Sequence, residues 1–450
     1  MNAQLLTAAV AELDQRIISD SSFGPKHFQQ LVSAQKELGL LHGDRPTCPF
    51  LRPHILSRDQ YSSVSLAAEI IARAFEKLVA RALADAELIK EFGLSAPELK
   101  LARLNPGYST LCVTSRLDAY VTESGFKFLE YNAESPAGVG DQMQLEKILF
   151  ELHHTKDFLE RHVHWCPQPH RLLLRALNDA YRDWGGEEER PQIAIIDWKD
   201  VATASEFRVL QRYFESEGQP TMIADPNELE YDGDRLRAGN FRIDIVYKRV
   251  VIHEFLERFD ETHALPRAYS DGRVCMANSF RSKVAHKKAG FAILTDPAYE
   301  HLFSPEEIQI FRRHIPWTRW VRMGTTMFED EEHDLPILIR LEKDRLVLKP
   351  NDDYGGHGVF IGWESDAESW DAAIKLALKQ PYVVQERVPL KKLSIPMFTD
   401  RVQLEEMFID FNPFLFCNRV EGALVRLSSS SLLNVTSGGG QTALLVVEDL

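Results

Sequence analysis

The chain has 450 residues, 44% of them hydrophobic and 26% charged, a composition typical of a folded globular protein with two or three domains. The formal net charge of -15 argues against nucleic acid or an anionic membrane as a partner, because the overall field repels polyanions. No apolar run approaches a membrane span, and the N-terminal segment acquires charge too early for a secretory signal, so a cytoplasmic location is expected.

The first half of the chain alternates helical and strand patterns. Apolar residues at three- and four-residue spacing predict a helical N-terminal region over 1–100. A two-residue period predicts strands over 108–132, and helical spacing returns over 141–163 and 171–184. A polar, charged stretch at 185–191 then indicates a linker before a new unit.

The second half begins with a buried-strand pattern at 193–197. A helix over 203–217 and strands over 221–224 and 243–247 follow, which predicts a small layer of parallel strands with helices. From about residue 266 onward, helices alternate with strands. The expected helices are 283–293, 304–314 and 366–379, and the expected strands are 345–349 paired with 358–362, then 382–386, 404–410, 414–420 and 443–447. The fold class is α/β shading into α+β.

A hairpin within 115–132 carries the most informative polar residues. We place Glu123, Ser124 and Gly125 in a three-residue loop, which pairs Thr122 with Phe126. This register sets Asp118 opposite Glu130 and Arg116 opposite Asn132, with Tyr120, Thr122, Phe126 and Phe128 on the same face. A loop of two or four residues would instead turn Asp118 away from Glu130.

Opposed carboxylates repel one another unless a cation lies between them. Asp118, Glu130 and the amide oxygen of Asn132 form an oxygen-rich set that suits Mg²⁺ holding substrate phosphates. Arg116 beside them is a candidate contact for a transferring phosphoryl group. The alternative is a hairpin face whose charges are simply solvated.

A second ribbon, 346–361, has a glycine-rich tip. Lys349 ends its first strand, where a phosphate would offset the cost of burying the ammonium. Gly355 and Gly356 would let backbone amides approach phosphate oxygens, although a mobile hairpin tip explains them as well. Glu386 ends the strand 382–386, where it could bind adenine or ribose or could be solvated. A second phosphate-binding lysine could be one of Lys283, Lys287 and Lys288. The alternative is that all three lie on a solvated helix face.

Together these motifs resemble the ATP-grasp superfamily in its circularly permuted form (type 2), and in particular the synthetase domain of glutathionylspermidine synthase. The metal motif of the hairpin precedes Lys349 and Glu386 by more than two hundred residues, which is the permuted order. The resemblance implies a permuted ATP-grasp fold with a pre-ATP-grasp α/β layer and a helical N-terminal region.

The resemblance also implies a role for each matching residue. Mg²⁺ would bind Asp118, Glu130 and Asn132, while Arg116 and Arg426 would be catalytic. ATP would contact two lysines, two glycines and a four-residue hinge, namely Lys288, Lys349, Gly355, Gly356, Gln385, Glu386, Arg387 and Val388. Ser135 would contact the substrate. The implied segments are a helical region (1–100), a segment with the metal hairpin (101–165), the α/β layer (190–265) and the nucleotide-binding lobes (266–450).

The implied activity is ligation of a small-molecule carboxylate and an amine through an acyl phosphate, with ATP and Mg²⁺ as cofactors. The chain has no cysteine amidase domain, and its tail, Asn434 to Gly440, lacks the aromatic–basic ending of glutathionylspermidine synthase. Glutathione and spermidine are therefore not implied, and the substrates and the oligomeric state stay open. An ATP-dependent phosphotransferase, a non-catalytic nucleotide-binding protein and a scaffold led by the helical N-terminus are the alternatives.

Overall fold

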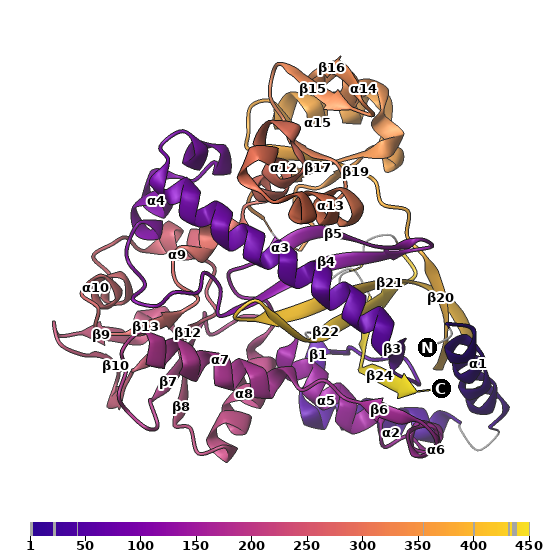
Figure 1. Cartoon of the computed structure of the whole chain (residues 1–450). Helices are drawn as coiled ribbons and strands as arrows, with labels where there is room; N and C mark the ends of the chain where they lie inside the picture. The colour runs from indigo at the N-terminus through magenta and orange to yellow at the C-terminus, as the bar shows by residue number, and fades with distance from the viewer. Residues whose placement is uncertain are drawn as a thin grey trace.

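A six-stranded sheet lies at the centre of the molecule. The computed structural model describes residues 3–20, 24–42, 44–353, 355–398, 401–430, 433 and 439–449. The sheet has the order β23-β22-β21-β4-β5, and β20 pairs with the outer part of β21. Its strands are β4 (Thr114–Thr122), β5 (Gly125–Asn132), β20 (Lys392–Phe398), β21 (Val402–Phe416), β22 (Arg419–Ser428) and β23 (Gly440–Thr442). The early hairpin therefore shares one sheet with strands from the end of the chain (Figure 1).

β21 is longer than the sequence pattern predicts. We expected separate strands at 404–410 and 414–420, but β21 runs unbroken through Pro413. The register between β21 and β22 shifts between Pro413 and Leu415, and an irregularity of this kind accommodates a proline within a strand. The turn comes at Cys417 and Asn418, whose φ values of 47° and 63° fit a tight two-residue hairpin.

The α/β layer has the parallel strands that the sequence predicts. Their order is β13-β12-β7-β8, with all three pairings parallel. The strands are β7 (Ile193–Ile196), β8 (Thr221–Ala224), β12 (Ile245–Lys248) and β13 (Cys275–Ala277), and α7 (Pro169–Asp183) and α8 (Ala204–Ser216) pack with them. β7 is fully buried, which explains its unbroken apolar run.

A smaller lobe, in orange at the top of Figure 1, holds the predicted glycine-rich ribbon. Its antiparallel sheet has the order β14-β19-β17-β18, from β14 (Thr318–Trp320), β17 (Leu346–Pro350), β18 (Phe360–Ile361) and β19 (Tyr382–Glu386). The expected pairing of 345–349 with 358–362 is confirmed by the pairs Val347–Ile361 and Leu348–Phe360. Trp370 and Ile374 of α15 (Ala367–Ala377) fill the core under β17.

The first 100 residues are mainly helical, with α1 (Ala3–Ser19), α2 (Pro25–Leu38) and α3 (Arg58–Ala84) as the main helices. A capping box between Ser57 and Gln60 begins α3, and Phe75 and Leu78 are among the residues that bury one of its faces. The helical prediction misses three short strands, β1 (Leu41–His42), β2 (Arg45–Pro46) and β3 (His54–Ser57). β3 pairs with β24 (Leu444–Asp449), which also pairs with β6 (Val163–Trp165).

The remaining elements connect these layers. They are η1 (Leu88–Phe92), α4 (Ala96–Ala102), α5 (Val139–Leu149), α6 (His153–Arg161), η2 (Pro226–Glu228), β9 (Leu229–Tyr231), β10 (Leu236–Ala238), β11 (Phe241–Arg242), α9 (Ile252–Arg258), α10 (Ala264–Ser270), α11 (Ser282–His286), α12 (Ala289–Thr295), η3 (Pro297–Leu302), α13 (Pro305–His314), β15 (Thr325–Phe328), β16 (Glu331–Asp334), α14 (Leu335–Leu341), η4 (Lys343–Arg345) and η5 (Gly362–Glu364). Among the helices in the described ranges, none has both the length and the apolar character needed to cross a bilayer.

Candidate active site

The β4–β5 hairpin has the predicted register at its polar end and a different loop at its tip. Asp118 lies opposite Glu130, and Arg116 lies opposite Asn132, as expected. The expected pairing of Thr122 with Phe126 is wrong, because Thr122 pairs with Gly125 across a two-residue loop. A register shift between Asp118 and Ala119 leaves Leu129 as an extra residue in β5, and this bulge brings Asp118 back opposite Glu130.

The bulge also changes which side chains share the polar face. Phe126 and Phe128 belong to the main hydrophobic core rather than to the polar face where we expected them. Leu129, the extra residue of the bulge, lines the same cleft as Asp118 and Glu130. Lys127 lies opposite Tyr120. A bulge leaves little trace in residue type, so the alternation alone could not reveal it.

The polar residues of the hairpin form a connected set. Arg116 donates to both oxygens of Asp118, from Nε at 2.7 Å and from a terminal nitrogen at 3.1 Å. The Asn132 amide donates to Asp118 Oδ1 at 2.9 Å and to Glu130 Oε1 at 3.3 Å, which turns its oxygen away from both carboxylates. Burial raises the pKa of Asp118, but the guanidinium groups of Arg116 and Arg426 outweigh it and hold this pKa below its usual range. Asp118 therefore stays ionised.

Arg426 reaches this set from β22 in the second half of the chain. Its terminal nitrogen lies 2.9 Å from Asp118 Oδ2, and its Nε donates to Asp410 Oδ2 at 2.8 Å. Burial raises the pKa of Asp410 to about 6, although Arg426 opposes the shift. Asp410 is fully buried and fixes the orientation of Arg426.

Lys288 and Lys349 approach the same carboxylates from the small lobe. Lys349 Nζ donates to Gln385 Oε1 at 2.6 Å, and Lys288 Nζ lies 3.5 Å from Glu130 Oε2. Burial lowers the pKa of Lys349 to about 8, against the opposing effect of Glu130. Burial also raises the pKa of Glu130, but Lys288 and Lys349 outweigh it and lower this pKa.

One cleft of about 180 Å³ collects most of the residues that the sequence singles out. Asp118, Glu130, Lys288, Lys349 and Arg426 line it. So do two glycines of the loop between β17 and β18 and the four hinge residues, namely Gly355, Gly356, Gln385, Glu386, Arg387 and Val388. Each glycine has a positive φ, 68° and 82°, so the loop adopts a backbone conformation that side chains disfavour. Tyr354 of this loop and residues 434–438 of the tail lie outside the described residues.

A second pocket of about 550 Å³ adjoins the first across the hairpin. Asp118, Glu130, Gly355 and Arg426 line both, so the polar hairpin residues form a wall between them. Ser135, Arg116 and Asn132 line only the second pocket, together with Glu206 and Arg249 from the α/β layer. Ser135 therefore lies away from the first cleft.

The three lysines at the start of α11 and α12 separate into two groups. Lys283 and Lys287 are buried in an ionic network with Glu98 and Asp352, at 2.7 Å (Lys283–Asp352), 2.6 Å (Lys287–Asp352) and 3.0 Å (Lys287–Glu98). Only Lys288 of the three lines the cleft. The solvated helix face that we kept as an alternative is wrong for all three, because each is at least nine-tenths buried.

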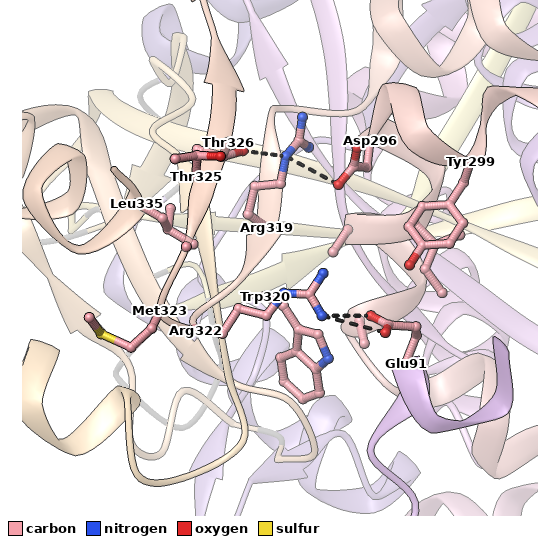
Figure 2. A pocket seen from close by; sticks show the side chains of 14 residues that line it. Glu91, Asp296, Tyr299, Arg319, Trp320, Arg322, Met323, Thr325, Thr326 and Leu335 are labelled. Atoms are coloured by element: carbon pink, nitrogen blue, oxygen red, sulfur yellow. Dashed lines mark hydrogen bonds and ion pairs between the residues drawn. The ribbon is translucent and has the colours of Figure 1, made fainter. Parts of the chain in front are cut away.

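A smaller cavity of about 60 Å³ lies behind α12, where η1 meets β14 (Figure 2). Its charged side chains point toward one another. Arg322 binds Glu91 at 3.1 Å, and Arg319 donates to Thr326 at 3.0 Å and lies 3.7 Å from Asp296. The paired charges indicate a structural joint between η1 and the small lobe.

The hairpin residues suit a magnesium ion that also binds phosphate. Within the described ranges, no group of three or more His, Cys, Asp or Glu side chains could hold an ion by itself. Asp118 and Glu130 face each other, and the Asn132 oxygen is turned away from them. Magnesium bound by one or two carboxylates and completed by phosphate oxygens and water fits this donor set.

Four further residues of the site were not identified from the sequence. Asp410 orients Arg426, Asp352 anchors two lysines, and Glu206 and Arg249 line the second pocket. Asp410 lies within the apolar strand β21, and a charge in such a run was the available signal. The other three depend on long-range contacts that carry no local pattern.

The chain is similar to two sequences that are named as ligases and to a solved structure of a glutathione synthetase-like effector. No family model matches the chain. A protein of Frankia alni, provisionally named glutamate–cysteine ligase 2-3, is 24% identical over 93% of this chain and 50% of its own length. A second relative, provisionally named glutamate–cysteine ligase 2-2, comes from Frankia casuarinae. It is 25% identical over 88% of this chain and 47% of its own length. The chain thus spans about half the length of the curated relatives it matches.

One solved structure covers nearly the whole chain. The glutathione synthetase-like effector GSS30 from Globodera pallida superposes with a TM-score of 0.59 at 14% identity, over 95% of this chain and 98% of the effector. The chain therefore shares the mixed α/β fold of that effector.

Proposed function

We propose that this chain is an ATP- and Mg²⁺-dependent ligase that joins a carboxylate to an amine through an acyl phosphate. The observation that carries the proposal is the convergence of two lysines, two carboxylates and Arg426 at one cleft, from both halves of the chain. Arg116 contacts Asp118 from the side of the second pocket. Opposed like charges at such a wall favour a ligand that carries both phosphate and cation. The relatives named as ligases support the same reaction class.

The cleft between the small lobe and the hairpin suits a nucleotide. Lys288 and Lys349 would neutralise the phosphates, and the backbone amides of Gly355 and Gly356 would contact phosphate oxygens. Residues 385–388 form the opposite wall, with Val384 and Tyr382 of the same strand packed beneath. Arg387 stacks over Trp363 at 4.1 Å, which gives this end of the cleft a flat lining.

Asp118 and Glu130 would hold Mg²⁺, joined by Asn132 once its amide turns its oxygen toward them. The bound ion neutralises charge on the phosphates. Arg116 and Arg426 would stabilise the charge that develops on the transferred phosphoryl group. Asp410 keeps Arg426 in place, and Asp118 stays ionised because both arginines contact it. The chain thus supplies positioning and charge, with no covalent intermediate on a side chain.

The reaction proceeds in two displacements. A substrate carboxylate oxygen attacks the γ-phosphorus of ATP, the bond to the bridging oxygen breaks, and ADP leaves. An amine nitrogen then attacks the acyl carbon, phosphate leaves with the electron pair, and the nitrogen loses a proton to give an amide. The second pocket, which meets the cleft at Asp118 and Arg426, would admit the acid and the amine, with Ser135 as a substrate contact.

The order of the motifs favours a circularly permuted ATP-grasp arrangement similar to that of glutathionylspermidine synthase. The hairpin with the metal motif precedes the lysine ribbon in sequence, yet β4 pairs with β21 in one sheet. On this proposal, 101–165 and 266–450 form the ATP-grasp unit, and 190–265 is the layer that precedes it. A cytoplasmic location is consistent with the five reduced cysteines.

The deciding experiment is a screen of carboxylate and amine pairs for ADP release with Mg²⁺ and ATP, with hydroxylamine added separately to trap an acyl phosphate as a hydroxamate. Glu130→Gln should lower turnover at least about a hundredfold, because the change removes a charge from the metal site. Glu123→Gln, the same change at the exposed tip of this hairpin, should leave turnover unchanged.

The products separate this proposal from its alternatives. ADP with an amide and a hydroxamate supports the ligase. A phosphorylated product without an amide identifies a phosphotransferase instead. Nucleotide binding without turnover identifies a binding protein. Full turnover by Glu130→Gln contradicts the metal assignment.

A further inference from the structure

One corner of the second pocket contains a carboxylate oxygen without a hydrogen bond. Glu206 of α8 is 3% exposed and lines this pocket. Its Oε1 accepts from the backbone N–H groups of Gly138 at 2.9 Å and Gly140 at 3.1 Å. No hydrogen-bond partner for Oε2 is present in the described part of the chain. The side chain is therefore held by one oxygen, while the other lacks a hydrogen bond.

Gln441 of β23 offers a second acceptor in the same pocket. Its Nε2 donates to Asp141 Oδ2 at 3.2 Å. This bond fixes the amide orientation while Asp141 is ionised, because a flipped amide would then set oxygen against oxygen. Oε1 of this 5% exposed residue lacks a hydrogen-bond donor among the residues that the structure describes. Asp141 also lines the pocket, so three side-chain acceptors meet there.

Arg249 supplies a donor beside these acceptors. It is 4% exposed and lines the pocket, and its Nη1 donates to the carbonyl of Pro136 and to the hydroxyl of Tyr247. Its terminal nitrogen lies 3.8 Å from Glu206 Oε2, while its Nε lacks a hydrogen-bond acceptor within the described ranges. An unsatisfied donor and an unsatisfied acceptor thus lie on neighbouring side chains.

We propose that this corner, formed by Asp141, Glu206, Gln441 and Arg249, binds the ammonium and carboxylate groups of an α-amino-acid substrate. Buried polar atoms without partners are costly, and a ligand that satisfies them recovers that cost. A simple amine would satisfy the acceptors and leave the Arg249 Nε unpaired. A simple acid would pair with the Arg249 Nε and leave the acceptors unsatisfied. A ligand that carries an ammonium and a carboxylate on the same carbon satisfies both, and an α-amino acid has this arrangement.

The electrostatics of this corner agree with a cationic group between the acids. Burial raises the pKa of Asp141 to about 7, and the neighbouring Glu206 adds to the shift. A bound ammonium would remove this repulsion and lower the pKa again. The assignment of the amino acid as a ligation substrate rests on the proposed function, whereas its binding does not require ATP.

The test is amino-acid binding to the full chain without nucleotide. Each of the common L-amino acids is titrated by calorimetry, and for any that binds, the amine lacking its carboxylate and the acid lacking its amino group are titrated as well. We expect at least one amino acid to bind, and both truncated probes to bind at least about tenfold more weakly. Glu206→Gln retains an oxygen for the Gly138 and Gly140 amides and should weaken the amino acid at least about tenfold.

Two further variants keep the outcome interpretable. Glu215→Gln makes the same change at an exposed position of α8 and should bind as the wild type does. Arg249→Lys retains a positive charge without Nε and should weaken binding of the amino acid while leaving binding of the truncated amine unaffected.

Three outcomes would overturn the inference: equal binding of the amine and the amino acid, no binding by any amino acid at about 10 mM, or unchanged binding by Glu206→Gln. Amino-acid binding without any ADP release supports the inference and refutes the ligase alone.

Discussion

Lys349, next to the end of β17, donates from its ammonium to Gln385, and burial lowers its pKa to about 8. The charged form, which phosphate requires, is therefore present below pH 8 and is lost as the pH rises through that value. We expect the dissociation constant of ADP, measured by calorimetry between pH 7 and 9.5, to rise about tenfold for each unit above 8. Lys349→Arg should flatten this dependence, because a guanidinium stays protonated. A wild-type affinity that is constant to pH 9.5 would show that Lys349 does not bind phosphate.

A second pH dependence, at acid pH, is expected from Asp410. Burial raises its pKa to about 6, so its charge is present above that pH and is lost below it, and Arg426 then loses the carboxylate that orients it. We expect kcat for ADP release to fall as the pH drops through about 6. Asp410→Asn should show a kcat about 10- to 100-fold lower, without this acid limb, while the nucleotide affinity changes less than about threefold. A variant with a wild-type pH profile would contradict this role.

At the scale of elements, the network around Asp352 ties the glycine-rich ribbon to two helices. Asp352 follows β17 and pairs with Lys283 of α11 and with Lys287, which also binds Glu98 of α4. Burial raises the pKa of Asp352, but the two lysines outweigh it and lower this pKa strongly. The stabilisation is therefore present above the unfolded pKa of about 4 and is lost as the pH falls below it.

Replacing Asp352 leaves two buried ammonium groups short of a counterion. We expect Asp352→Ala to lower the free energy of unfolding by about 3–5 kcal/mol, measured by urea denaturation at pH 7. Asp371→Ala removes the partner of Arg340 in an exposed pair of the same lobe and should cost less than about 1 kcal/mol. Equal effects of the two substitutions would mean that burial contributes nothing to the network.

Individual strands and helices were largely predictable, because the residue pattern that defines each one lies within its own segment of the sequence. β19 and β8 have the expected bounds, since apolar runs and flanking turn residues define both ends. The β4–β5 bulge and the continuous β21 were missed, because each depends on a partner strand that fixes the register. The Asp118–Glu130 pairing was nevertheless predicted, since two differences, a shorter loop and one bulged residue, cancel at that position.

At the scale of the whole molecule, the candidate site is assembled from segments that lie far apart in the chain. The sequence indicated the hairpin, the lysines and the hinge, and these line one cleft. The corner at Glu206 was not predictable, because Asp141, Glu206, Arg249 and Gln441 come from four elements or loops that meet only in the folded chain. Residue type indicates a charge, whereas burial and missing partners become visible only in three dimensions.

The same long-range assembly places the C-terminal strand inside the structure. Leu444, Leu445, Val446 and Val447 of β24 are at most 1% exposed, and β24 lies between β3 and β6. Burial of four such side chains contributes roughly 6–12 kcal/mol, which is comparable with the whole stability of a domain. A chain that ends at Ala443 should therefore lose its cooperative thermal transition or accumulate as aggregate, because it also leaves the edges of β3 and β6 unpaired.

The control is Val163→Thr, at a 59% exposed position of β6, which keeps the pairing and should change the free energy of unfolding by less than about 0.5 kcal/mol. If the truncated chain melts cooperatively at the wild-type temperature, then β24 is dispensable and the two ends of the chain are not held together by this sheet.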